Sequence, residues 1–294
     1  MKFGLRYANL GRFVDGPPAT EIAQAAEAAG FESIWTIEHV LVPADYESRY
    51  PYSPTGKMTS DHSMDIPDPL IWLAWVAAVT ERINLATGIL IVPQRNPLVL
   101  AKTVATLDAM SGGRVRLGIG VGWLEEEFDA LGVPFAARGP RTDDYIAAMR
   151  SLWETADGPA SHHGRFVDFA DVYSRPLPAA PGGRVPIIVG GQTPPAAQRA
   201  GRLGDGYFPA REQPWDLIDE MRRTAEAHGR DPDAIELTLS APEDPDGLAE
   251  LARRLRPTDR VLVPVTGLVG LGRQLDNPED IARYGREIIE RFDR

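Results

Sequence analysis

The sequence predicts a (β/α)8 barrel, also called a TIM barrel, formed by residues 1–294 as one domain. Three observations support this fold class. Short β-branched or apolar segments alternate with amphipathic segments, which is the pattern of parallel strands joined by crossover helices. Eight such units occur, the number that closes a barrel. The length of 294 residues is long for an average domain but ordinary for an α/β barrel.

Each expected strand is a short apolar or β-branched run, and an amphipathic helix follows it. The strands are expected at residues 2–7, 33–37, 83–91, 115–119, 185–189, 206–208, 236–239 and 260–263. The helices are expected at residues 19–29, 69–79, 97–110, 141–154, 194–203, 214–228, 245–255 and 278–291. Six of these eight helices open with proline, which suits a first helical turn because no N–H donor is needed there.

Two insertions interrupt the alternation, one after the second strand and one before the fifth. Residues 40–68 are polar and rich in Pro, Tyr and Ser, and residues 157–184 contain a segment, 164–169, that is typical of a short hairpin. Loops of this length in a compact domain usually bind ligands or act as lids. We therefore expect the first insertion on the C-terminal rim of the barrel, where barrel enzymes carry their active sites.

The composition excludes several function classes. Lys and Arg number 31 against 42 Asp and Glu, and the resulting net charge of −11 disfavours binding to nucleic acid or to an anionic membrane. The absence of cysteine excludes disulfides, thiolate nucleophiles and cysteine-based metal sites. The five histidines show no H-x-H or H-E-x-x-H spacing, so we expect no metal. The first residues contain no long apolar run, so we expect a cytoplasmic protein.

The second expected strand ends in Glu38 and His39. A histidine at the C-terminal end of a barrel strand can act as a general acid or base, because imidazole titrates near neutral pH and a neighbouring carboxylate can tune it. The alternative is a structural histidine that binds a loop carbonyl.

Glycines occur within the third expected strand and at the end of the fourth. Gly88 lies inside the third strand, where glycine allows a close approach by a ligand or simply packs inside the barrel. The fourth strand runs into Gly118, Gly120, Gly122 and Trp123. This G-x-G-x-G spacing is not the dinucleotide-binding fingerprint, but it suits a loop whose backbone lets a planar ring come close.

The fifth strand ends in Gly190, Gly191, Gln192 and Thr193, and a helix is expected to begin at Pro194. Backbone N–H groups and the helix dipole at such a turn can bind a phosphate. The alternative is an ordinary helix N-cap by Thr193.

Together these residues resemble the luciferase-like family of flavin and deazaflavin oxidoreductases. The most specific segments are residues 86–89, 95–97, 101–102, 107–114, 118–123, 190–192 and 202–207. Within the family the chain is most similar to members assigned to coenzyme F420, whose second strand ends in an acid–histidine pair like Glu38–His39.

The resemblance implies a position for the cofactor. Its ring would lie in the barrel mouth over Gly88 and Ile89, which the family joins by a non-prolyl cis peptide. The remaining cofactor contacts would be Glu38 and His39 beside the ring, Gly120, Gly122 and Trp123 along one side, and Gly190, Gly191, Gln192 and Thr193 at the phosphate.

The resemblance also implies an activity, hydride transfer between F420 and a small organic substrate. We expect His39 to exchange a proton with the substrate while Glu38 orients it. Relatives that act on sugar phosphates carry a carboxylate in place of Trp123 and a hydroxyl-and-lysine pattern absent from residues 208–211, so we expect an apolar or aromatic substrate.

Two alternatives remain open at this point, an FMN-dependent monooxygenase and a non-catalytic flavin- or deazaflavin-binding protein. The family resemblance further implies a homodimer.

Overall fold

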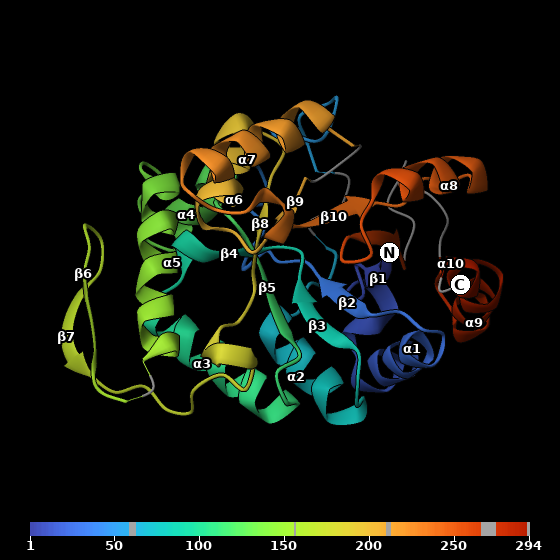
Figure 1. The fold of residues 1–294 in the computed structure, drawn as a ribbon, viewed down its shortest axis with the longest axis horizontal. Coiled ribbons are helices and arrows are strands. Elements are labelled where there is room, and N and C mark those ends of the chain that lie inside the picture. Colours follow the sequence, from blue (N-terminus) through green and yellow to red (C-terminus); the bar gives the residue numbers. More distant parts are fainter. Residues whose placement is uncertain (59–62, 156, 210–212, 266–274, 293–294) are drawn as a thin grey trace.

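The computed structural model describes residues 1–58, 63–155, 157–209, 213–265 and 275–292 of the chain. A closed barrel of eight parallel strands lies at its centre, and helices surround the barrel (Figure 1). The barrel strands are β1 (Lys2–Arg6), β2 (Ser33–Thr36), β3 (Asn84–Thr87), β5 (Val115–Gly120), β8 (Ile187–Gly190), β9 (Gly206–Phe208), β10 (Glu236–Ser240) and β11 (Arg260–Pro264). They pair in this order, with β11 returning to β1. The predicted barrel is confirmed, although the third expected strand, residues 83–91, is interrupted at Gly88 and Ile89 and continues as the separate strand β4 (Leu90–Ile91).

The predicted helices are also present. They are α1 (Gly16–Ala28), α2 (Pro69–Val79), α3 (Pro97–Ser111), α5 (Arg138–Glu154), α6 (Pro194–Leu203), α7 (Trp215–Ala227), α8 (Pro245–Arg254) and, for the last, α9 (Pro278–Tyr284) continued by a π-helical turn (Gly285–Ile289) and α10 (Glu290–Phe292). Among the described residues one α-helix was not predicted, α4 (Glu125–Ala130). It has only six residues and no side-chain N-cap, so it leaves little periodic signal. No helix among the described residues combines the length and hydrophobicity that crossing a membrane would need.

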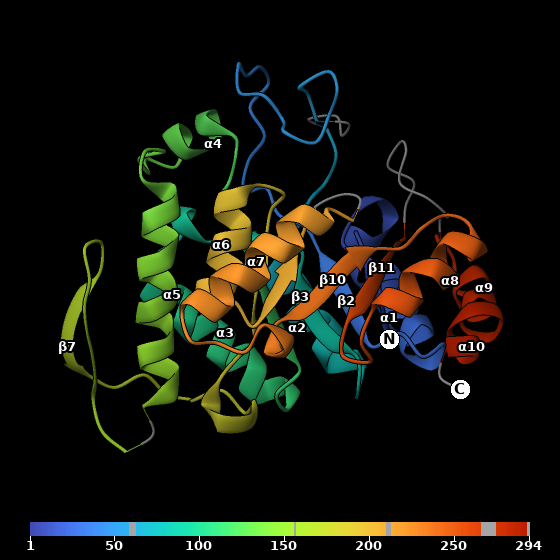
Figure 2. The same ribbon diagram turned by 45° about the horizontal axis from the view of Figure 1, so that its top comes forward.

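Both insertions lie outside the barrel. The second contains the predicted hairpin, β6 (Ala160–His163) paired antiparallel with β7 (Asp168–Val172), which runs along the outer side of α5 (Figure 1). The first insertion rises above the C-terminal ends of the strands near α4 (Figure 2). The position expected for this insertion on the rim is confirmed for its described residues.

Side chains alternate between the inside of the barrel and the layer beneath the helices, as the period of a β-strand requires. Leu5, Ile34 and Leu85 belong to the outer core that the helices cover. The inside of the barrel is filled by a second cluster, consisting of Trp35, Ala86, Ile188, Phe208 and Leu262 with Ile89 packed against it.

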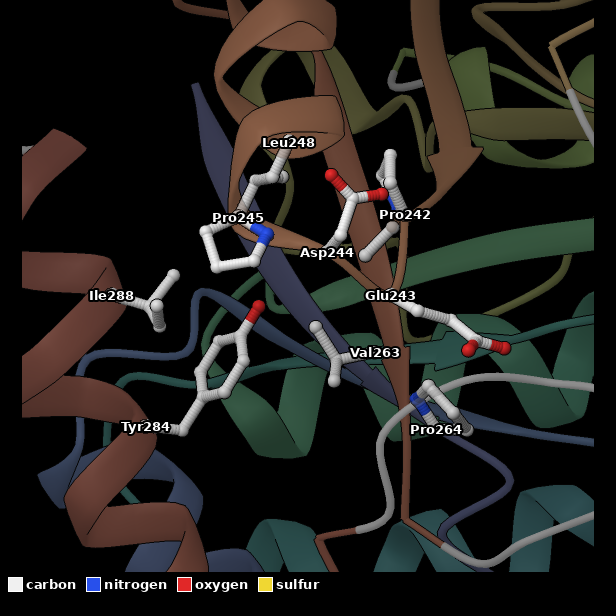
Figure 3. A pocket seen from close by; sticks show the side chains of 10 residues that line it. Pro242, Glu243, Asp244, Pro245, Leu248, Val263, Pro264, Tyr284 and Ile288 are labelled. Atoms are coloured by element: carbon white, nitrogen blue, oxygen red, sulfur yellow. The ribbon is translucent and has the colours of Figure 1, made fainter.

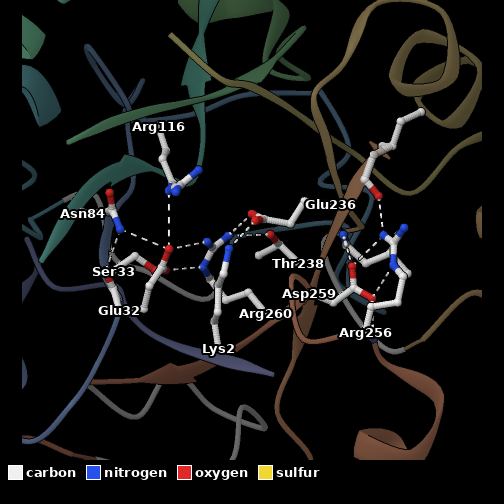
Figure 4. Close-up of polar contacts among 12 residues, drawn as sticks. Lys2, Glu32, Ser33, Asn84, Arg116, Glu236, Thr238, Arg256, Asp259 and Arg260 are labelled. Carbon is white, nitrogen blue, oxygen red and sulfur yellow. Dashed lines mark hydrogen bonds and ion pairs between the residues drawn. The ribbon is translucent and has the colours of Figure 1, made fainter. Parts of the chain in front are cut away.

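A charged network closes the N-terminal end of the barrel (Figure 4). Arg260 is fully buried, and its guanidinium donates to both carboxylate oxygens of Glu32 at 2.7 and 2.8 Å and to Glu236 at 2.5 Å. Burial would raise the pKa of Glu32, but Arg260 and Arg116 lower it to about 2. This end of a barrel serves stability rather than catalysis, so the network is structural.

Candidate active site at the barrel mouth

His39 lies three residues beyond the end of β2, on the C-terminal rim of the barrel. Its side chain is 11% exposed, and its Nδ1 atom lies 3.1 Å from Oε2 of Glu127, whose side chain is fully buried. Glu127 belongs to α4. A carboxylate at Nδ1 fixes the ring and holds the proton on that nitrogen, which leaves Nε2 as the atom that can exchange a proton with a ligand.

Glu127 also anchors the start of the first insertion. Its Oε1 atom accepts the backbone N–H of Val40 at 2.7 Å and that of Leu41 at 3.3 Å. Burial would raise the pKa of Glu127, but the hydrogen bonds from His39 and from these N–H groups lower it below its ordinary value. The carboxylate is therefore ionised at neutral pH, and one side chain fixes both the histidine and the loop that follows it.

The prediction that Glu38 orients His39 is wrong. The buried carboxylate of Glu38 accepts the N–H of Ile91 at 2.5 Å and forms an ion pair with Arg95, which also binds Asp68 at 2.9 Å. The carboxylate of Glu38 is therefore engaged by Ile91 and Arg95, while His39 has Glu127 as its partner. Burial raises the pKa of Glu38, although Arg95 opposes this rise.

The cis peptide predicted between Gly88 and Ile89 is present. Both residues remain partly exposed. The side chain of Ile89 occupies the space beside Gly120 and Gly190, since a Cβ atom there would come within 2.3 and 2.5 Å of it. These two glycines therefore make room for Ile89. The sequence pattern predicts room for a cofactor ring at Gly120 and for a phosphate at Gly190. Ile89 itself is placed to form the apolar floor of the mouth.

Trp123 is the centre of an aromatic cluster above the strand ends. Its ring lies 5.0 Å from that of Tyr50, 5.7 Å from that of Tyr46 and 6.2 Å from that of His39, measured between ring centroids. Gly122 before it has φ +79°, a conformation that glycine adopts readily. The two tyrosines come from the first insertion, so the insertion and the β5–α4 loop together build one aromatic wall.

The turn after β8 offers fewer phosphate donors than predicted. Gly191 has φ +126°, and the N–H of Gln192 donates to the hydroxyl of Tyr52 at 3.3 Å. Two prolines without N–H groups open α6. The next two N–H groups of that helix donate to the carbonyl of Thr193 at 3.0 Å, and Thr193 caps the helix. The donor that remains best placed is the N–H of Gln192, with Tyr52 of the insertion directly over it.

The sequence analysis missed the role of α4 as the support of the first insertion. Glu126, the residue before Glu127, accepts hydrogen bonds from the backbone N–H groups of Glu47 at 2.6 Å and Ser48 at 3.0 Å. Although burial would raise the pKa of Glu126, the hydrogen bonds from Ser48 and Glu47 lower it to about 2. The run of three glutamates at residues 125–127 was the available signal, because acidic side chains favour a first helical turn.

We expect Glu126→Gln to loosen the first insertion without unfolding the barrel. A neutral amide accepts hydrogen bonds from the two N–H groups less strongly than a carboxylate does. Trypsin should therefore cleave after the exposed Arg49 several-fold faster in this variant than in the wild type. Glu125→Gln is the matched control, because the Glu125 side chain is exposed on the same helix. Equal cleavage rates in Glu126→Gln and Glu125→Gln would contradict the anchoring role.

A separate pocket lies between α8, α9 and the ends of β10 and β11 (Figure 3). It is lined by Ala241, Pro242, Glu243, Asp244, Pro245, Leu248, Val263, Pro264, Tyr284 and Ile288. No predicted site residue lines it, so we place the candidate site at His39 and not here.

Two further expectations concern metals and residues 208–211. In the described part of the chain, no group of three His, Asp or Glu side chains could hold a metal ion. Of residues 208–211, Ala210 and Arg211 lie outside the described residues, as do residues 59–62 of the first insertion.

Comparisons with known proteins identify the family and the fold. Residues 14–257 match the model of the luciferase-like monooxygenase family. An F420-dependent glucose-6-phosphate dehydrogenase of Kineococcus radiotolerans is 32% identical over 303 residues, which cover 98% of this chain and 80% of that protein. The fold is similar to that of the monooxygenase RslO1 from Streptomyces bottropensis, with a TM-score of 0.74, 22% identity and coverage of 99% and 100% of the two chains. It is also similar to that of the F420-dependent tetrahydromethanopterin reductase of Methanopyrus kandleri, with a TM-score of 0.70, 19% identity and 99% coverage of both chains.

Proposed function

Since this chain belongs to the luciferase-like monooxygenase family, we propose that it is an oxidoreductase that transfers a hydride between coenzyme F420 and a small organic substrate. The observation that carries the proposal is the His39–Glu127 pair, which sits at the barrel mouth together with the partly exposed Gly88–Ile89 segment. The 32% identity to an F420-dependent dehydrogenase supports the choice of a deazaflavin.

The residues at the mouth fit a flat ring with a phosphate-bearing tail. Ile89 offers an apolar surface beneath the ring, and Trp123 offers an aromatic wall at its side. The turn at Gly191, Gln192 and Thr193 would hold the phosphate through the Gln192 N–H, which now donates to Tyr52. When bound, a deazaflavin supplies hydride chemistry, while the protein supplies position and charge.

His39 is the proton-exchanging group in this proposal. Glu127 holds its Nδ1 side, so Nε2 gives a proton to the substrate, or takes one from it, as the hydride moves. Glu38 has a different part. By binding the N–H of Ile91 and the guanidinium of Arg95, it fixes the chain that follows the Gly88–Ile89 peptide. A direct contact between Glu38 and the cofactor remains a prediction.

The aromatic wall of Tyr46, Tyr50 and Trp123 supports an apolar or aromatic substrate. Such side chains contribute a large apolar contact area and favourable edge-to-face geometry with a ring.

The second candidate function is an FMN-dependent monooxygenase. The description of the matching family and the similarity of the fold to that of a monooxygenase favour it. A non-catalytic carrier is disfavoured by the His39–Glu127 pair, since holding a cofactor does not require an oriented imidazole.

Titration of the purified protein with F420 and with FMN, followed by ligand fluorescence, separates the two candidates. We expect F420 to bind in the micromolar range or more tightly, with FMN binding at least about tenfold more weakly, a difference of about 1.4 kcal/mol. NADP should not bind, because the Gly118–Gly122 segment lacks the dinucleotide-binding spacing. Tighter binding of FMN than of F420 would favour the monooxygenase.

We also propose a cytoplasmic homodimer. Ile71 and Trp75 on α2 and Val99 on α3 are large apolar side chains with 71%, 52% and 65% of their surfaces exposed, and together they suit a contact with a second copy.

A further inference from the structure

Arg6 is the last residue of β1, and its side chain is directed into the top of the barrel. The strand alternation shows this, because Arg6 shares a face with Gly4 two residues earlier. A Cβ atom on Gly4 would come within 2.8 Å of Ser33 and Trp35 and within 2.6 Å of Leu262, all of which point inside the barrel. Arg6 thus lies above the interior cluster, on the inner side of the mouth.

The guanidinium of Arg6 is buried without a carboxylate. The residue is 4% exposed, and its contacts are a hydrogen bond to the Ser240 hydroxyl at 3.1 Å and the ring of Tyr7 at 4.8 Å. No Asp or Glu among the described residues forms an ion pair with it. Arginine is almost never buried unless it is paired, because removing its charge from water is costly.

The other buried arginines of the described chain have more complete hydrogen bonding. Arg260 has two carboxylate partners, Arg199 has Asp143, and Arg114 donates to four backbone carbonyls and a threonine hydroxyl. Arg141 donates to the carbonyl of Pro134 and lies 5.3 Å from the centroid of the Phe166 ring. Of these five buried arginines, only Arg6 has a buried guanidinium nitrogen without a hydrogen-bond partner among the described residues.

The unused edge of Arg6 has the geometry of a carboxylate site. Its Nη1 atom binds Ser240, and its buried Nε atom has no hydrogen-bond partner among the described residues. At the other end of the barrel, Arg260 uses Nε and Nη2 to bind the two oxygens of Glu32. The Nε–Nη2 edge of Arg6 could bind a carboxylate in the same bidentate manner.

The position of Arg6 separates it from the expected cofactor phosphate. In the barrel order, β1 and β8 are four strands apart in either direction, so Arg6 faces the Gly190–Thr193 turn across the mouth. A cofactor whose tail lies at β8 leaves the β1 side to the substrate. We propose that Arg6, positioned by Ser240, binds a carboxylate of the substrate, which makes the substrate an aromatic or apolar carboxylic acid. This inference rests on the proposed function.

The test uses the enzyme saturated with F420 and two probes of nearly equal shape, benzoate and its neutral analogue benzamide. Isothermal titration calorimetry should show benzoate binding at least about tenfold more tightly than benzamide. Arg6→Met should remove this preference. Arg6→Lys should weaken benzoate binding several-fold, because lysine keeps the charge but cannot form a bidentate pair with a carboxylate. Arg223→Met, an equal loss of charge on the exposed face of α7, should bind both probes as the wild type does.

Two outcomes would overturn the carboxylate site while the proposed function stands. One is wild-type enzyme that binds F420 but does not prefer benzoate to benzamide, whether or not either probe binds. The other is unchanged benzoate affinity in Arg6→Lys and Arg6→Met. If F420 itself does not bind to the wild type, the proposed function fails first, and the two failures are thereby distinguished.

Discussion

His39→Ala should lower the rate of hydride transfer by about 10²–10⁴-fold while the affinity for F420 changes little. The reason is that His39 is the only histidine at the mouth among the described residues, and Glu127 binds its Nδ1 atom. Removing it would delete the proposed proton-exchanging group but leave Ile89 and the Gly190–Thr193 turn intact. The measurement is single-turnover absorbance of the deazaflavin with a substrate found by screening carboxylic acids.

The control for this prediction is His163→Ala. His163 lies on the outer hairpin with 66% of its side chain exposed, so its loss should leave the rate unchanged. If His39→Ala were as fast as His163→Ala, His39 would be a structural residue, and the proton would have to come from another group of the mouth.

Arg260→Met should lower the free energy of unfolding by about 3–5 kcal/mol, because it leaves Glu32 and Glu236 at the barrel end without their buried counter-charge. Urea unfolding at neutral pH would measure this loss. The surface variant Arg223→Met should change the free energy of unfolding by less than about 0.5 kcal/mol. A loss below about 1 kcal/mol in Arg260→Met would show that the network contributes little.

The same variant has a pH signature. The pKa of Glu32 is lowered in the folded protein to about 2, from an ordinary value of 4.5. Its contribution to stability is therefore fully present above about pH 4.5 and is lost as the pH falls toward 2. In Arg260→Met this acid-dependent loss should be smaller, since the larger of the two charges that lower the Glu32 pKa has gone and only that of Arg116 remains.

The sequence was sufficient to predict the barrel, because strand and helix patterns depend on local residues. It also located the rim, since the ends of parallel strands must meet there, and it placed His39 at that rim. The partner of His39 could not be predicted from spacing. Glu38 is adjacent in sequence but points away, while Glu127 is 88 residues distant and comes from a helix too short to leave a pattern.

The glycines show a second limit of sequence reasoning. Their pattern predicts a close approach of some group to the backbone, but not which group approaches. At Gly120 and Gly190 it is the side chain of Ile89, which lies between β3 and β4. Two prolines without N–H groups occupy the first positions of α6, so the sequence itself indicates that this helix start is a weak phosphate site.

In the proposed function His39, held by Glu127, exchanges the proton during hydride transfer with F420. The most direct measurement is the pH dependence of single-turnover hydride transfer in the wild type, His39→Ala and Glu127→Gln. The pKa of Glu127 is lowered, so its carboxylate is ionised throughout the working range and holds the Nδ1 side of His39. We therefore predict that Glu127→Gln and His39→Ala both change the pH profile of the rate from that of the wild type. Superimposable profiles for the three proteins would contradict a role for His39 in proton exchange.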